Sequence, residues 1–399
     1  MRLTVPANYD ESILPELKQL SVQEIYGRLN DDVVGGGRPS YMATPLHKPA
    51  LASYITAIHA NGLEFNYLMN SACLGNREWT KAFQKRLERE LVWLEEQGVD
   101  TITVAAPLLL EIIKRRHPRL KVKVGIYAQV DTVKRAEYWD GLGADAINLA
   151  SFSINRDFEK LQRIRAAVKA DLVLIANHFC QPNCPYQVQH QNNHAHASGR
   201  DAKFLIDYPI MQCQHNRLRQ PRLFIAAGWI RPEDIQAYEA IGYTTFKLLE
   251  RNIPSEEIIK RATAYHNRRF EGNMAELLLS WGFKKAAPKA SFSYLVRNFR
   301  PWHLGIGRAR SLMDFMKGQG MMFPVPNGEA PIIIDSAAIP DNFLDHFRKG
   351  SCLDRSCAQC GYCAGIARKA VRIQPEFLAG VLPKYADLQE SMLTGGMWD

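Results

Sequence analysis

Short apolar runs alternate with amphipathic helical stretches between residue 1 and about residue 268. This alternation is typical of a parallel sheet whose strands are joined by helices. The candidate strands are residues 2–7, 24–28, 64–70, 101–106, 121–127, 146–150, 171–177, 223–227 and 244–249. A (β/α)8 barrel needs eight strands, so we assign residues 223–227, inside the long insertion between Asn177 and Thr244, as the surplus one. We therefore predict an α/β fold, a TIM-like barrel, with an open doubly wound sheet as the alternative.

Helical periodicity fills most of the gaps between these strands. The predicted helices are residues 78–97, 107–116, 132–141, 157–169, 232–241 and 255–266. On the first helix, five apolar side chains fall on one face: Trp79, Phe83, Leu87, Leu91 and Leu94.

The alternation stops after about residue 270, which predicts two domains, a barrel over residues 1–270 and an extension over residues 271–399. Residues 291–323 are basic and aromatic, and residues 324–328, P-V-P-N-G, indicate a turn. Residues 331–335 are the one candidate strand of the extension. The extension also holds the densest group of cysteines.

The composition is that of a globular protein, with 46% hydrophobic and 23% charged residues. No apolar run approaches the roughly 18 residues of a membrane span, and the N-terminus lacks the layout of a secretory signal. We therefore expect a cytoplasmic protein with no membrane span. The net charge of +9 suits an RNA or acidic partner. The basic residues are dispersed, except in residues 114–119 and 297–310, where a solvated surface is the favoured interpretation.

Four cysteines in the extension form what we call the tail set, spaced Cys352-x4-Cys357-x2-Cys360-x2-Cys363. Three thiols at x2 spacing can wrap one face of a 4Fe-4S cluster, as in bacterial ferredoxins, and Cys352 supplies a local fourth ligand. Zinc is the lesser alternative for this site, because four thiolates also suit tetrahedral zinc. Structural disulfides are not expected in a cytoplasmic chain.

The other four cysteines, the barrel set, are Cys73, Cys180, Cys184 and Cys213. Cys73 and Cys180 follow predicted strands directly, so both belong to the face on which barrel enzymes place their sites. Cys184 and Cys213 lie in the insertion that follows. We predict a second 4Fe-4S cluster here. For Cys73 a buried apolar role is the alternative.

Polar residues at predicted strand ends are candidate substrate contacts, each with a local hydrogen bond or ion pair as its alternative: Asn70, Gln129, Asn148, His178, Lys247 and Arg251. Lys247 and Arg251 suit an anionic group. The histidine-rich stretch of His190, His194 and His196 suggests a metal site, with a polar loop or helix face favoured. The G-G-G-R sequence at residues 35–38 offers backbone amides to an anion, with a flexible turn favoured.

Six segments resemble the collagenase-like peptidase U-32 family. They are L-T-V-P-A at residues 3–7, E-I-Y-G at 24–27, K-V-G-I-Y-A-Q at 123–129, N-H-F-C-Q-P-N-C-P-Y-x3-H at 177–190, D-Y-P-I-x2-C at 207–213 and T-T-F-K-L-L-E-R at 244–251. The fourth is the most specific and resembles a branch reading N-x2-C-x2-N-C-P-x4-H. In the last, Leu249-Glu250 stands where the family has E-G. The chain from about residue 271 lies outside the resemblance.

The resemblance implies oxygen-independent hydroxylation, because family members act in ubiquinone biosynthesis or on tRNA and ribosomal RNA. In the quinone branch four cysteines hold a 4Fe-4S cluster, and Cys180, Cys184 and Cys213 match those ligands. We therefore expect an iron–sulfur redox enzyme that modifies a small metabolite at the barrel mouth. Its expected partners are an electron donor such as ferredoxin or flavodoxin and a related chain in a heterodimer.

Three alternatives stay open at this point. RNA-base modification is supported by the basic stretches. Peptide hydrolysis follows the family name, although the sequence has no His-Glu-x2-His motif and no Gly-x-Ser-x-Gly elbow. A non-catalytic electron-transfer subunit is the third.

Overall fold

The barrel predicted from the alternation is present and closed. The computed structural model describes residues 1–30, 32–39, 46–198, 207–251, 253–279, 330–352 and 355–397. Eight parallel strands pair in chain order, and β8 pairs with β1 to close the sheet. Their bounds are β1 Arg2–Pro6, β2 Val22–Gly27, β3 Glu64–Met69, β4 Thr101–Val104, β5 Lys121–Val124, β6 Ala146–Asn148, β7 Asp171–Ile175 and β8 Thr245–Lys247. The doubly wound alternative is therefore wrong.

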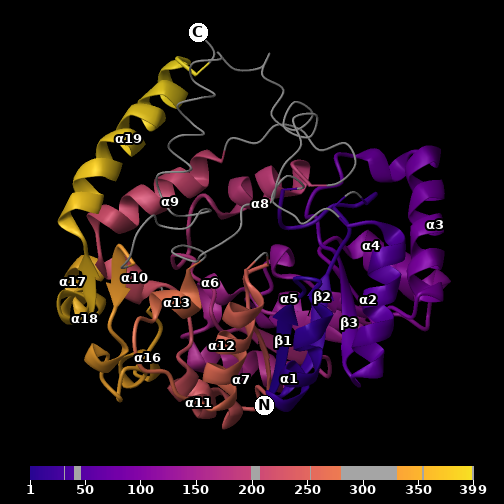
Figure 1. Ribbon diagram of the computed structural model, residues 1–399, viewed down its shortest axis with the longest axis horizontal. Coiled ribbons are helices and arrows are strands. Elements are labelled where there is room, and N and C mark those ends of the chain that lie inside the picture. The colour runs from indigo at the N-terminus through magenta and orange to yellow at the C-terminus, as the bar shows by residue number, and fades with distance from the viewer. Residues whose placement is uncertain are drawn as a thin grey trace.

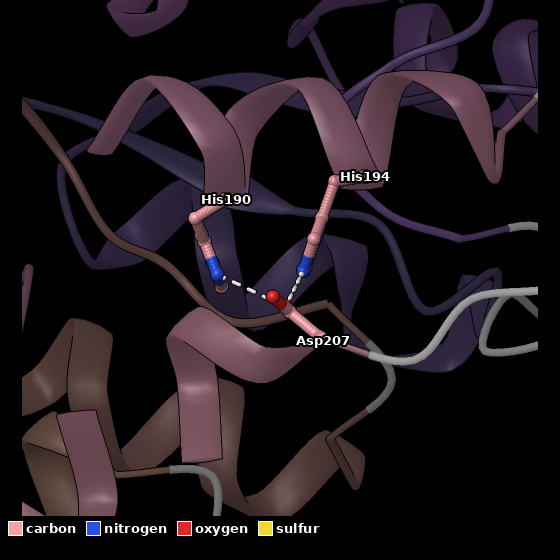
Figure 2. A group of neighbouring side chains, drawn as sticks. All are labelled: His190, His194 and Asp207. Carbon is pink, nitrogen blue, oxygen red and sulfur yellow. Dashed lines mark hydrogen bonds and ion pairs between the residues drawn. The ribbon is translucent and has the colours of Figure 1, made fainter. Parts of the chain in front are cut away.

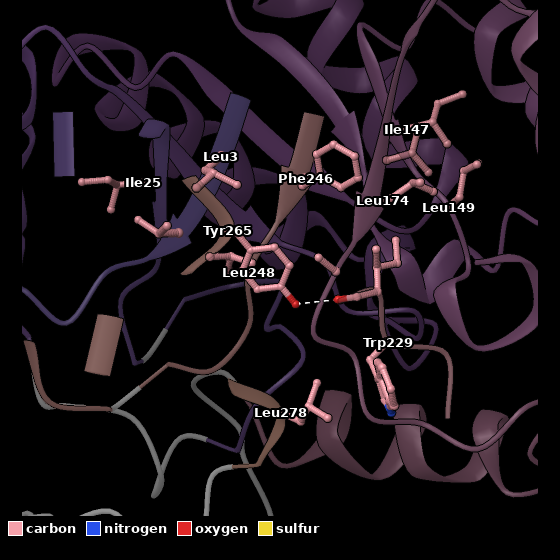
Figure 3. Packing of buried hydrophobic residues seen from close by; sticks show 14 of the residues in the cluster. Leu3, Ile25, Ile147, Leu149, Leu174, Trp229, Phe246, Leu248, Tyr265 and Leu278 are labelled. Carbon is pink, nitrogen blue, oxygen red and sulfur yellow. Dashed lines mark hydrogen bonds between the residues drawn. The ribbon is translucent and has the colours of Figure 1, made fainter. Parts of the chain in front are cut away.

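Side chains alternate along the strands between two environments. Leu3, Ile25 and Phe246 are fully buried in the apolar layer beneath the surrounding helices (Figure 3). In the same layer, Tyr265 donates a hydrogen bond to the Ile230 carbonyl at 2.8 Å. The alternate residues of β2, β3 and β5 are polar and meet one another across the interior, which places a polar layer inside the barrel.

The helices of the barrel include six that begin and end close to the predicted bounds and four, at residues 14–19, 48–60, 151–154 and 275–278, that were not predicted. They are α1 Leu14–Gln19, α2 Lys48–Ala60, α3 Lys81–Glu96, α4 Pro107–Arg116, α5 Val133–Gly141, α6 Ser151–Ile154, α7 Phe158–Ala167, α11 Ile235–Glu239, α12 Ser255–His266 and α13 Ala275–Leu278. The Thr80 hydroxyl caps α3 by accepting the Phe83 N–H. Trp79 therefore lies before the helix, in a 3-10 turn, and is 71% exposed, so the prediction that it belongs to the apolar face of this helix was wrong.

The insertion between β7 and β8 is helical. It contains α8 Gln187–His196, α9 Tyr208–Arg219 and α10 Arg222–Ala226. Residues 223–226 of the predicted surplus strand belong to α10, so that prediction was wrong. The cause is Pro221, whose backbone is already helical and starts the turn. In Figure 1, α8 and α9 extend across one end of the barrel.

The C-terminal elements pack against this insertion. They are the antiparallel pair β9 Ile332–Ile334 and β10 Val371–Ile373, and the helices α16 Asp345–Arg348, α17 Cys357–Cys360, α18 Tyr362–Ala370 and α19 Pro375–Thr394. α18 contacts α10, and α19 contacts α9 (Figure 1). The strand predicted at residues 331–335 is confirmed as β9. The segment 291–323 and the turn at 324–328 lie outside the described residues, and the domain division near residue 270 stays a prediction.

None of the helices in the described ranges combines the length and the apolarity needed to cross a membrane.

Candidate functional site

A buried polar network occupies the interior of the barrel. Both carboxylate oxygens of Glu24, on β2, accept hydrogen bonds from the Lys123 ammonium of β5, at 2.6 and 2.7 Å. Asn66 of β3 donates to the same carboxylate at 3.0 Å and accepts from the Thr103 hydroxyl at 2.8 Å. Burial acts to raise the pKa of Glu24, but Lys123 and Asn66 outweigh it, so the pKa lies below its ordinary value. The interior therefore holds a paired charge beneath the mouth.

Lys247 lies in the same interior, at the end of β8. Its side chain is buried, and its ammonium lies 3.9 Å from the centre of the Tyr26 ring. Burial lowers the pKa of Lys247 to about 7, and repulsion from Lys123 adds to the effect, while Glu24 opposes it. A group with this pKa changes charge near neutrality and responds to an anion placed beside it.

Three arginines surround the mouth above Lys247. Arg38 donates to the backbone carbonyl of Arg251 at 2.9 Å and forms an ion pair with Glu250. Arg28 pairs with Asp32 at 2.9 Å. Burial, together with Arg251, lowers the pKa of Arg38 to about 9, and burial together with Arg28 lowers the pKa of Arg251. These cations lie close enough to repel one another, and the role of Lys247 and Arg251 in holding an anionic group stays a prediction.

The glycine loop at residues 35–37 lies beside these arginines, and its amides already have partners. The Gly36 N–H donates to the Ser198 hydroxyl at 2.7 Å, and the Gly37 N–H donates to Asn70 Oδ1 at 3.2 Å. Gly35 has φ +88°, which favours glycine. The loop is thus held in place by hydrogen bonds from its own amides, one of which goes to the Asn70 side chain, and its predicted flexibility stays untested.

Two further predicted contacts lie at strand ends. Gln129 follows β5 with φ +52° and donates from Nε2 to Gln191 of α8 at 3.0 Å. Asn148 of β6 donates to the Val124 carbonyl at 2.7 Å, while its buried Oδ1 accepts no hydrogen bond from the described residues. Asn148 therefore offers an acceptor to a bound molecule, whereas Gln129 connects the barrel to α8.

His178 lies between a hydroxyl and a thiol. Its Nδ1 contacts the Ser151 hydroxyl, and its Nε2 lies 3.2 Å from Cys180 Sγ. Burial lowers the pKa of His178 to about 3, with Arg217 adding to the effect. Burial raises the pKa of Cys180 to about 12, and the neighbouring Cys213 adds to that effect. The pair is therefore a neutral imidazole beside a neutral thiol.

Three thiols of the barrel set lie close to one another. Cys180 and Cys184 lie between β7 and α8, while Cys213 lies on α9 and contributes to the raised pKa of both of the other thiols. Arg217, one turn beyond Cys213, acts in the opposite direction on both thiols. Its guanidinium lies 4.1 Å from the Phe179 ring centre, which holds a cation beside the three sulfurs.

Cys73 lies in the loop after β3 and is partly exposed. Its backbone carbonyl accepts from the Ser71 hydroxyl at 2.8 Å. The charge interactions described for Cys180 and Cys184 do not include Cys73. Its membership of a ligand group stays a prediction.

Three cysteines of the tail set lie on α17 and α18, while Cys352 lies in the loop before α17. Gly361, with φ +64°, reverses the chain between Cys360 and Cys363. Burial raises the pKa of Cys363 to about 11; Arg156 opposes this effect and the other three tail cysteines add to it. The four tail thiols therefore lie close enough to one another for their charges to interact.

Arg156 is a cation that the spacing could not reveal. It comes from the barrel side, directly before α7, and lies 4.7 Å from the Trp229 ring centre and 4.8 Å from that of Phe343. His346, which lies 3.3 Å from Cys360 Sγ and stacks on Tyr362, was also missed. Neither Arg156 nor His346 belongs to the cysteine motif, so the spacing of that motif could not predict them.

The sulfur spacing provides a test of which group would fit. Among the described residues, which include all eight cysteines, no three sulfur atoms lie mutually within 4.8 Å. Four thiolates on one zinc ion lie about 3.8 Å apart, given Zn–S bonds of about 2.3 Å. In a 4Fe-4S cluster each thiolate binds a different iron, so wider spacing fits. The cysteines of the described residues therefore do not form a preformed tetrahedral zinc site, and the assignment of two 4Fe-4S clusters stays a prediction.

The histidine stretch lies on α8 above the mouth. His190 and His194 face Asp207, which precedes α9 (Figure 2). His196, on the same helix, is exposed. Asp207 was not predicted as a partner of these two histidines, although Asp207 is the first residue of the D-Y-P-I motif. Its partners precede it by 13 and 17 positions, too far for any local spacing to pair them.

The barrel, with basic groups and thiols at the carboxyl ends of its strands, defines a TIM-barrel protein of the kind that carries its site at the mouth. Comparison with known proteins gives the family. The model of peptidase family U32 matches residues 35–213. The uncharacterized protease MJ1657 of Methanocaldococcus jannaschii is 32% identical over 250 residues, which is 62% of this chain and 73% of the relative. The chain belongs to peptidase family U32.

Two solved structures are similar to parts of this chain at low sequence identity. The U32 peptidase Mk0906 is 20% identical, with a TM-score of 0.48 over 64% of this chain and 94% of its own. Phosphoribosyl anthranilate isomerase from Thermus thermophilus is 12% identical, with a TM-score of 0.36 over 67% of this chain and 98% of its own.

Proposed function

We propose that this chain is an iron–sulfur redox enzyme that modifies a small anionic metabolite at the barrel mouth, by oxygen-independent hydroxylation or a related reaction. The observation that carries the proposal is the packing of the two cysteine groups around one insertion. α9, which bears Cys213, contacts α19, and α10 contacts α18, which bears Cys363. Two cluster sites joined by directly packed helices suit electron transfer from one to the other.

The chemistry of each group supports its role. Cys180, Cys184 and Cys213 would hold a cluster beside the mouth, with Cys73 as the candidate fourth ligand, and the tail set would hold the second cluster. Such clusters supply one-electron transfer when bound. Arg217 and Arg156 place a positive charge beside each group, which stabilises thiolates and the negative charge of a cluster.

The basic mouth supports an anionic substrate. Lys247, Arg38 and Arg251 are buried cations whose pKa values are depressed by burial and by neighbouring cations. An anion between them removes that repulsion and accepts charge-assisted hydrogen bonds. A carboxylate or phosphate on a small metabolite is the group that this arrangement would bind, and ferredoxin or flavodoxin would supply the electrons.

RNA modification has less support from the described surface. In the basic run at residues 114–119, three cations already have acidic partners: Lys114 pairs with Asp145, Arg116 with Glu88 and Arg119 with Glu95. The second basic run, residues 297–310, lies outside the described residues.

Peptide hydrolysis is the second candidate, because Cys180 Sγ lies 3.2 Å from His178 Nε2. A cysteine nucleophile with a histidine base uses such a contact. However, that chemistry needs a thiolate, and burial raises the pKa of Cys180 to about 12 while it lowers that of His178 to about 3. The pair would be inactive at neutral pH without a large change in its surroundings.

The deciding experiment is anaerobic purification followed by iron and acid-labile sulfide analysis. We expect two clusters per chain. The change of Cys352, Cys357, Cys360 and Cys363 together to alanine should remove about half of the iron, and Cys180→Ala should remove the other half. Unchanged iron in the quadruple variant, or a colourless zinc protein without sulfide, would refute the proposal. Casein cleavage by the anaerobic protein, lost in Cys180→Ala, would favour the peptidase.

A further inference from the structure

Two histidines and one aspartate converge on a single point above the barrel mouth. His190 and His194 lie one turn apart on α8, and both rings face Asp207 (Figure 2). His190 Nδ1 lies 2.9 Å from Asp207 Oδ2, and His194 Nε2 lies 2.8 Å from the same oxygen. Among the described residues, this is the one group that brings three histidine, cysteine or carboxylate ligand atoms within 4.8 Å of one another. The side chains are largely buried, with Asp207 8% and His194 14% exposed.

The neighbours of this group hold it in a fixed orientation. His194 Nδ1 lies 3.3 Å from the Gly37 carbonyl, which can only accept a hydrogen bond, so Nδ1 carries the hydrogen. Asn193 Nδ2 contacts the other carboxylate oxygen of Asp207 at 3.5 Å. Nε2 of a neutral His194 therefore presents its lone pair to Asp207 Oδ2. Metal-binding histidines are commonly oriented in this way, with the second ring nitrogen donating to a carbonyl.

Two acceptors that face each other at 2.8 Å require a positive charge between them. A proton on His194 Nε2 would satisfy this contact, because a neutral His190 can donate from Nδ1, and the result would be one imidazolium ring whose centre lies 4.3 Å from that of the second ring in a largely buried site. One divalent cation would satisfy both ring nitrogens and the carboxylate oxygen at once.

We propose that His190, His194 and Asp207 bind one divalent transition-metal ion, of the zinc or iron(II) type, at a site separate from all eight cysteines. Two imidazoles and one carboxylate are a ligand set used for catalytic zinc and for non-haem iron(II), and both leave positions open. Ligand atoms about 2.0–2.2 Å from one ion lie about 3.0–3.4 Å apart, a few tenths of an ångström wider than the two contacts seen here. A small adjustment of the side chains therefore admits the ion.

The position of the site gives it a role at the mouth. The Gly37 carbonyl that orients His194 also accepts from the Tyr127 hydroxyl, and the Gly37 N–H donates to Asn70. The ion would lie directly beyond this loop, with its open positions available to a carboxylate or phosphate oxygen. The site depends on α8 and Asp207 alone and stands whether or not the cysteines hold clusters.

The experiment compares metal binding in the full-length wild type with two variants and one control. The His190→Ala/His194→Ala double variant removes two ligands, and Asp207→Asn removes the carboxylate with almost no change of shape. His196→Ala is the matched control, because His196 lies on the same helix and is exposed. Each protein is stripped with a chelator under anaerobic conditions, loaded with Zn²⁺, Fe²⁺ or Co²⁺, and analysed for bound metal. Circular dichroism checks that each variant is folded.

We expect the double variant to bind one equivalent less than wild type and the His196→Ala control to bind as much as wild type. The Asp207→Asn variant should bind this one metal ion at least about tenfold more weakly than wild type. If the double variant does not fold, the affinity of Asp207→Asn for the metal decides the question. The cobalt difference spectrum between wild type and variant should contain visible d–d bands without the intense near-ultraviolet bands of cobalt–thiolate charge transfer. Equal metal content in all four proteins, or a thiolate band in the difference spectrum, would show that Asp207 is simply hydrogen-bonded to the histidines.

Discussion

The ion pair inside the barrel provides the sharpest test of the structure. We consider Lys123→Met, which keeps most of the side-chain volume but removes the ammonium from the Glu24 carboxylate. The side chains of Lys123 and Glu24 are 8% and 7% exposed. Without Lys123 the carboxylate keeps Asn66 as its hydrogen-bond donor and Lys247 as its nearest cation. The variant thus leaves a buried charge that is only partly compensated.

The expected cost follows from this burial. Removal of one partner from a buried ion pair typically destabilises a protein by about 3–5 kcal/mol. Lys121→Met, on the same strand, is the matched control, because Lys121 pairs with Glu64 at 3.2 Å with side chains 57% and 35% exposed. An exposed pair of this kind contributes less than about 1 kcal/mol. The double variant Glu24→Gln/Lys123→Met should be more stable than Lys123→Met alone, because it buries no charge.

The assay is equilibrium unfolding in denaturant at several pH values. In wild type the pKa of Glu24 is lowered on folding, so its contribution to stability is present above the ordinary pKa and lost as the pH falls through the folded value. In Lys123→Met the unpaired Glu24 carboxylate should instead have a raised pKa. At acidic pH it should therefore become protonated, which removes the buried charge and its cost in stability. The stability gap between wild type and variant should narrow as the pH falls from neutral to mildly acidic. A Lys123→Met variant that loses no more than Lys121→Met, or a gap that does not change with pH, would refute this assignment.

Two further tests address the mouth and its support. Because the pKa of Lys247 falls to about 7 on folding, the folded state binds fewer protons than the unfolded state between about pH 7 and 10.5, so stability should rise with pH across that window. The Lys247→Met variant should lose this rise, and an unchanged slope in pH-dependent unfolding would contradict the assignment. Gly228→Ala should destabilise by about 1–3 kcal/mol, because the new Cβ would lie 2.3 Å from the Ser151 carbonyl oxygen. Gly380→Ala, on α19 with open space around it, is the control and should stabilise by about 0.5–1 kcal/mol in thermal unfolding.

The fold was predictable to the extent that burial patterns are local. All eight barrel strands lie where short apolar runs predicted them, although β2 begins two residues earlier than expected and β8 ends at Lys247. The strand predicted at residues 223–227 was wrong because a short apolar run with no periodicity fits a buried helix as well as a strand. In α10, Phe224 and Ile225 are both fully buried, so the segment has no exposed face to mark it as a helix. The placement of Trp79 within a helix was wrong for a different reason: α3 begins after Thr80, whose hydroxyl caps it.

Site residues that lie at the ends of strands could be predicted from the sequence. Site residues that reach their partners through tertiary packing could not. Lys247 and Arg251 follow directly from the end of β8, and Cys180 from the end of β7. Arg156 reaches the tail set only because α18 packs on α10, to which Arg156 is bound through the Ile225 carbonyl at 2.7 Å. Asp207 reaches His190 only because α9 returns the chain under α8. No spacing along the chain encodes either approach.

The insertion between β7 and β8 determines how the rest of the molecule is assembled around the mouth. The family match ends at residue 213, so α9 begins inside the shared region and ends beyond it. His215, just past that limit, stacks on Tyr385 of α19 with ring centres 5.7 Å apart. One turn of α9 therefore carries Cys213 of the barrel set and also an anchor for the C-terminal helix. A shift of α19 would move this turn and its thiol together, so the position of the C-terminal elements is coupled to the geometry of the three thiols at the mouth.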